Sequence, residues 1–110
     1  MSPLKVERYS STLGDWGELG EVLPHDPPGS LSDNKPDGTR DLYVFTCEPD
    51  DSKSTLYRSK AGVDTRWGRF RAFDSTGLEI VKELQRGESV ELTVKTDNSP
   101  KLIQYRFTHK

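Results

Sequence analysis

The chain is poor in the residues that mark several common classes of protein. It has one cysteine among 110 residues, which excludes an intramolecular disulfide framework and predicts a cytoplasmic, thiol-tolerant location. Its longest apolar run, at 42–45, is too short for the hydrophobic region of a signal peptide or for a membrane span. Repeats and heptads are also absent, so solenoids and coiled coils are excluded. Aliphatic, aromatic and sulfur-containing residues make up 31% of the chain, which predicts a small core.

A strong charge of either sign is lacking as well. The formal net charge is −2, which excludes a generally basic protein that coats nucleic acid, so that any such binding must use a local patch. Residues 1–39 hold three basic and seven acidic residues, whereas residues 40–110 hold 13 basic and 11 acidic residues. The basic surplus therefore lies in the second part of the chain.

The length predicts a single domain over residues 1–110. Partial alternation of apolar and polar residues predicts a strand at 4–12. The glycine-rich stretch 14–20 is typical of a bulged or bent strand, which can resume at 21–23. Prolines and glycines at 24–39 predict a long surface loop.

The rest of the chain carries clearer periodicity. Alternating or β-branched segments predict strands at 42–47, 55–60, 66–73, 89–95 and 102–108. Apolar residues at Leu78, Val81 and Leu84 follow a helical spacing and predict an amphipathic helix over 76–86, which Gly87 ends. The alternating apolar residues expected in the core are Tyr43, Phe45, Ile103, Tyr105 and Phe107.

The stretch Trp67–Lys95 combines a polar and aromatic strand, a short turn, an amphipathic helix and the phrase LQRGESVEL at 84–92. This arrangement resembles the second half of single-strand-binding domains of the oligonucleotide/oligosaccharide-binding (OB) fold. The resemblance implies a mainly β fold, a small five-stranded antiparallel OB-like barrel with one short helix between strands 3 and 4. An open β-sandwich or an SH3-like roll, with 76–86 as a loop containing one helical turn, is the alternative that periodicity leaves open.

Basic and aromatic residues alternate in the predicted strand 66–73. Side chains two apart in a strand share a face, and a face of guanidinium groups and rings suits single-stranded nucleic acid, because cations track phosphates and rings stack on bases. The predicted nucleic-acid-binding residues are Arg58, Lys60, Trp67, Arg69, Arg71 and Phe73. The structural alternative is a solvated strand face whose arginines pair with nearby acids. The sequence therefore predicts a non-catalytic module that binds single-stranded DNA or RNA.

The acidic, proline-rich segment 13–38 favours a second interpretation. It is long and polar enough to be the contact surface of a protein–protein interaction module, such as a complex subunit, an adaptor or an inhibitor. Trp16 within it is either a core plug or an exposed contact. Barrels and sandwiches also stack sugars on tryptophan and tyrosine, so a carbohydrate ligand is a third possibility.

Catalytic and metal-binding patterns are weak. The glycines at 14, 17 and 20 are followed by no Lys-Ser/Thr pair and lie among acids that repel phosphate. Cys47, His25 and His109 have no metal-ligand spacing, and no nucleophile lies in a context that suggests a neighbouring base. The sequence predicts no metal, no cofactor and no enzymatic activity.

Overall fold

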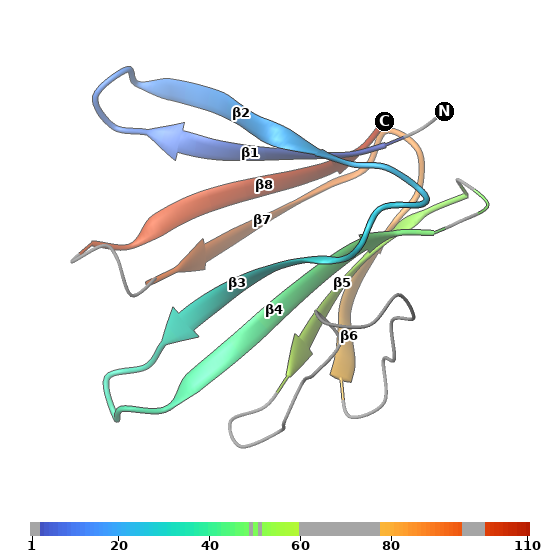
Figure 1. The fold of residues 1–110 in the computed structure, drawn as a ribbon. Helices are drawn as coiled ribbons and strands as arrows, with labels where there is room; N and C mark the ends of the chain where they lie inside the picture. The colour runs from blue at the N-terminus through green and yellow to red at the C-terminus, as the bar shows by residue number, and fades with distance from the viewer. Residues whose placement is uncertain (1–2, 49, 51, 60–77, 96–100) are drawn as a thin grey trace.

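The computed structural model describes residues 3–48, 50, 52–59, 78–95 and 101–110. In these residues eight strands form two four-stranded antiparallel sheets, which Figure 1 shows as two layers. The strands are β1 (Leu4–Ser10), β2 (Asp15–Val22), β3 (Gly29–Asn34), β4 (Arg40–Cys47), β5 (Ser54–Ser59), β6 (Leu78–Leu84), β7 (Ser89–Val94) and β8 (Ile103–His109). The first sheet has the strand order β2-β1-β8-β7 and the second sheet β3-β4-β5-β6. No helix within these ranges is long and apolar enough to cross a membrane.

This architecture overturns the predicted five-stranded barrel with one helix. The described strands lie in two separate sheets that do not close into a barrel, and none of the described residues is helical. The chain is mainly β, as expected, but its layers are those of an open β-sandwich. The predicted strand 66–73 lies outside the described residues.

The predicted helix at 76–86 is wrong where the structure describes it, because Leu78–Leu84 forms β6. A bulge in the β5–β6 ladder places Leu56 opposite Lys82 and Tyr57 opposite Ile80, so that Val81 is an extra residue. An extra residue breaks the period of two that marks a strand. The apolar residues on either side of the bulge therefore acquire the spacing of a helix while remaining in a sheet.

The predicted loop at 24–39 contains a strand, since residues Gly29–Asn34 form β3 and pair with β4. This strand has few large side chains of its own, and the ring of Phe45 on β4 supplies apolar packing beside it. Gly29 lies opposite Phe45 in the ladder, and the ring of Phe45 fills the space that a side chain at Gly29 would occupy. The β propensity of its own residues does not predict such a strand, because the apolar side chain that packs against it belongs to the neighbouring strand β4.

The core lies between the two sheets and draws on both. The rings of Phe45 from the second sheet and Phe107 from the first lie 4.8 Å apart, centroid to centroid. The buried residues that form the core are Leu4, Val6, Val22, Tyr43, Phe45, Cys47, Leu56, Leu84, Val94, Ile103, Tyr105 and Phe107. Burial of the five aromatic and aliphatic residues predicted for the core is thus confirmed, and the side chain of Cys47 is buried among them.

The two sheets are joined along one side. The backbone N–H of Asn34, at the end of β3, donates to the carbonyl oxygen of Lys95 at 2.9 Å, and the N–H of Lys95 donates to Oδ1 of Asp33 at 3.1 Å. These bonds tie the β3 edge of the second sheet to the end of β7. The strands β2 and β6 form the opposite edges of the two sheets.

Candidate binding surfaces

The structure places one of the six residues predicted to bind nucleic acid. Arg58 lies on β5, whereas Lys60, Trp67, Arg69, Arg71 and Phe73 lie outside the described residues. The described residues therefore do not test whether these six side chains form one face.

Arg58 is engaged by neighbouring side chains. It lies opposite Tyr43 on one side and Glu79 on the other, and its guanidinium forms an ion pair with the Glu79 carboxylate. The hydrogen bond to Glu79, followed by one to the Tyr43 hydroxyl, raises the pKa of Arg58 above its ordinary value. Because its charge is already compensated, Arg58 alone is a weak ligand for a phosphate.

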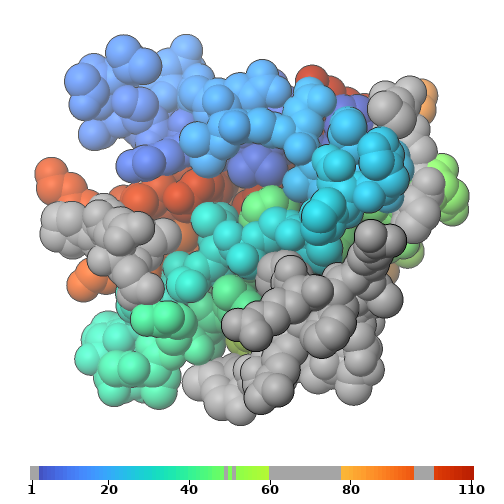
Figure 2. All heavy atoms as spheres, viewed as in Figure 1, coloured from blue at the N-terminus to red at the C-terminus, as the bar shows by residue number. Residues whose placement is uncertain are grey.

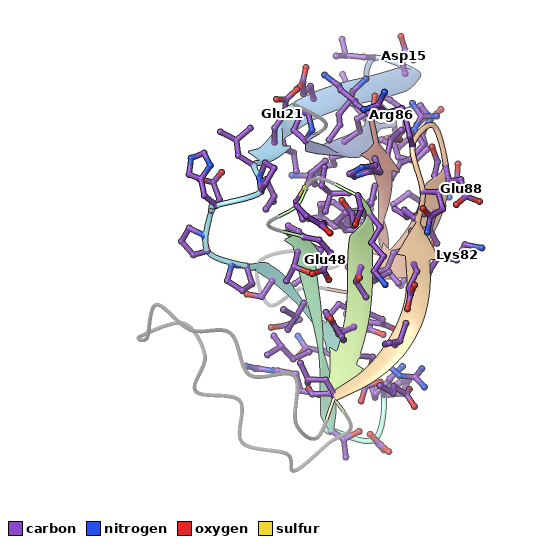
Figure 3. The ribbon with its side chains drawn as sticks, turned by 90° about the vertical axis from the view of Figure 1, so that its right-hand side faces the viewer. Asp15, Glu21, Glu48, Lys82, Arg86 and Glu88 are labelled. Carbon is purple, nitrogen blue, oxygen red and sulfur yellow. The ribbon has the colours of Figure 1, made fainter. Side chains whose placement is uncertain are left out.

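The acidic segment 13–38 is placed more completely. Its first part forms β2, which carries three acids and no basic residue and is the outermost strand of the first sheet (Figure 1). Figure 3 shows Asp15 and Glu21 on this strand, with Glu48 and Lys82 lower in the view. The β1–β2 hairpin projects at one end of the molecule, where its blue atoms are visible in Figure 2.

The ladder between β1 and β2 decides which side chains of β2 share a face. Val22 lies opposite Leu4 and Gly20 opposite Val6, so these positions belong to the inner, core-facing side. A bulge opposite Val6 and Glu7 makes Leu19 the extra residue, and 59% of Leu19 is exposed. The predicted bulged strand at the glycine-rich stretch is thereby confirmed.

Trp16 lies on the outer face of the first sheet, half-buried, and is therefore not a core plug. Its ring is edge-on to Tyr9, its cross-strand partner, with centroids 5.5 Å apart. The guanidinium of Arg106 lies 4.5 Å from the centroid of Trp16 and donates from Nε to Oε1 of Glu7 at 2.9 Å. We call Glu7, Tyr9, Trp16 and Arg106 the outer cluster. It fixes Trp16 and leaves Arg106 engaged by two groups.

The outer cluster gives a prediction about acid stability. The hydrogen bond from Arg106 lowers the pKa of Glu7 below its ordinary value, against the effect of burial. A lowered folded-state pKa contributes stability above the unfolded value of about 4.3, and that contribution is lost as the pH falls through the folded-state pKa. We expect Arg106→Met to lower the free energy of unfolding by about 1–3 kcal/mol at neutral pH.

The measurement is urea unfolding of both proteins between neutral pH and pH of about 3, where the difference is expected to shrink because Glu7 becomes protonated. Arg8→Met is the control. Arg8 lies next to Glu7 on β1, but it is exposed and belongs to the opposite face of that strand. A difference between wild type and Arg106→Met that does not change with pH would show that the ion pair is not its source.

A hydroxyl and an imidazole meet in the core. Oγ of Ser54 and Nδ1 of His109 are 2.7 Å apart, but both residues are fully buried, so a substrate does not reach them. The Nε2 atom of His109 has no hydrogen-bond partner among the described residues. In the same ranges no three His, Cys, Asp or Glu side chains form a group able to hold a metal ion.

Comparison with known proteins provides no direct assignment: no family model, no curated protein and no solved structure matches the chain.

The best-defined candidate surface in the described residues is the edge formed by β2, an edge strand with acidic side chains and an exposed leucine. Sequence analysis identified the acidic residues of this segment but missed the exposure of Leu19 and the contacts of Trp16. The only sequence signal for them was the run of glycines, which indicates a bulge but not its position at a sheet edge.

Proposed function

We propose that the chain is a non-catalytic protein-binding module whose contact surface is the outer edge of β2. The observation that carries this proposal is the position of β2. It is the last strand of the first sheet, it has hydrogen-bonded strand pairing on one side only within the described residues, and it presents acidic side chains and an exposed leucine. Unpaired strand edges with such side chains are common sites of protein contact.

Electrostatics favours a protein partner over nucleic acid at this surface. The strand carries three acids and no basic residue; Lys110 forms an ion pair with Glu21, while Asp15 and Glu18 repel a phosphate backbone. Binding of single-stranded nucleic acid stays a prediction from sequence, centred on residues 66–73.

Site-specific photocrosslinking in the host cell tests the proposal. A benzophenone amino acid replaces Leu19 on β2 in one variant and Ile80 on β6 in another. The two positions are matched, because Leu19 is 59% and Ile80 is 56% exposed and both lie on edge strands. Ile80 is the direct partner of Tyr57 and lies on the face of the second sheet opposite to that of Arg58, so position 80 samples the β6 edge.

We expect a discrete protein adduct at position 19 that disappears when Glu18→Lys is added, and no such adduct at position 80. Equal protein adducts at both positions, or none at 19, contradict the proposal. A nuclease-sensitive adduct confined to position 80 would instead support nucleic-acid binding. Point variants are preferable to deleting part of the acidic, proline-rich segment, because removal of residues 26–36 would remove the whole of β3.

A further inference from the structure

Building on the proposed function, we infer that β2 binds its partner by strand addition, and that the added segment is extended and basic, with apolar residues alternating with lysine or arginine. In strand addition, a peptide pairs its backbone with an open sheet edge, and alternate side chains contact the two faces. The edge, its charge and the space beside it each specify part of this partner.

The sheet edges differ in whether they are open and in the charge that they carry. Among the described strands, β3 is bonded to the end of β7 through Asn34 and Lys95, which closes the side of the sandwich where those two edges lie. On the opposite side, β6 carries charges of both signs, Lys82 and Glu83, whereas β2 carries acids only. The β2 edge is therefore the one whose charge selects a partner.

The two faces of β2 differ. On the outer face Glu18 lies opposite Glu7, whereas Glu21 lies opposite Lys5 and accepts a hydrogen bond from Nζ of Lys110 at 2.6 Å. The inner positions next to Val22 are glycines, and a side chain added at Gly20 would meet nothing within 4 Å, while one at Gly17 would meet only the Arg8 carbonyl oxygen at 3.9 Å. An added strand thus finds carboxylates on the outer face and open space on the inner face, which apolar side chains can fill.

The same charges disfavour a second copy of this chain. If two β2 strands paired antiparallel with Glu18 opposite Glu18, these two outer-face carboxylates would lie side by side. Like charges that face each other across strands are destabilising. A basic segment in the same place is attracted to Glu18 instead of being repelled by it. The bulge at Leu19 interrupts the ladder, so the added strand is short.

The test uses the full chain and a short fluorescein-labelled synthetic peptide in which lysine alternates with valine, followed by fluorescence polarisation at moderate salt. We expect binding to weaken about tenfold in Glu18→Lys. The variant should also gain affinity for the charge-reversed peptide of glutamate and valine. Thermal unfolding checks its fold, which should persist because the new lysine faces Glu7.

Glu91→Lys is the matched control. Glu91 is exposed on β7, and its cross-strand partner is Arg106, so it belongs to the same outer face as Glu18. Three strand spacings, about 14 Å in all, separate it from β2, and this exceeds the screening length at physiological salt. Its peptide affinity should equal that of the wild type.

Two N-methylated peptides separate strand addition from simple charge attraction. In one peptide every lysine amide is methylated, and in the other every valine amide, so that each loses the hydrogen-bond donors of one edge. Strand addition predicts that one of them loses binding and the other keeps it. The inference is overturned if the two N-methylated peptides bind with equal affinity. It is also overturned if Glu18→Lys binds the lysine–valine peptide as tightly as the wild type does. If the peptide test fails in this way but the photocrosslinked protein adduct at position 19 still forms without Glu18→Lys, the protein-binding function stands and only the mode of binding is wrong.

Discussion

Replacing Phe107 with alanine is expected to lower the free energy of unfolding by about 3–5 kcal/mol, the range for removing a buried ring from a core that collapses only in part. Phe107 is fully buried at the centre of β8 and packs against Phe45 of the opposite sheet. The contact joins the two layers, and the sandwich has no disulfide to replace it, because the chain has one cysteine. A loss of this size is a large share of the stability of a small domain.

Urea unfolding followed by circular dichroism measures this effect. Leu102→Ala is the control, since Leu102 is 69% exposed just before the same strand and its removal should change stability by less than about 0.5 kcal/mol. Similar losses in the two variants would mean that the Phe45–Phe107 contact does not hold the layers together.

Gly29→Ala is expected to destabilise the protein by about 1–3 kcal/mol, the usual effect of overpacking. The new methyl group would occupy the space filled by the ring of Phe45, and even the third-nearest atom of that ring lies 3.0 Å from its position. Either the ring must leave its place in the core or β3 must move away from β4. Alanine elsewhere in a strand is usually better than glycine, so the sign of this change depends on the contact.

Gly20→Ala supplies the matched control. Gly20 also lies in a strand, and an added methyl group would meet nothing within 4 Å, so we expect this substitution to be neutral or to stabilise the protein by up to about 1 kcal/mol. Thermal and urea unfolding of both variants measure the contrast. The penalty at Gly29 should shrink in a Phe45→Leu background. A penalty that survives there would place its origin in the backbone of β3.

Local sequence was sufficient to predict several elements. Alternation at 42–47, 89–95 and 102–108 predicted β4, β7 and β8 to within two residues, because one buried face enforces a period of two. The same alternation identified Tyr43, Phe45 and Phe107 as core residues. The acidic character of 13–38 and the bulge among its glycines were also readable from the chain.

Periodicity failed where a neighbouring strand changed its meaning. At 78–84 the extra residue Val81 gave a strand the apolar spacing of a helix, and a bulge is visible only in the ladder with β5. Residues Gly29–Asn34 were predicted as loop because their apolar cover, Phe45, belongs to β4.

For the candidate site as well, some properties follow from the sequence and others only from the tertiary structure. The sequence by itself determined that β2 carries acids, glycines and one tryptophan, since these are properties of the chain. Only the tertiary structure decided that β2 is an edge strand, that Trp16 is fixed by Tyr9 and Arg106, and that the space beside Gly20 is open. The physical reason is that a strand's period reports which of its faces is buried, whereas its place in a sheet depends on pairing between segments far apart in the chain.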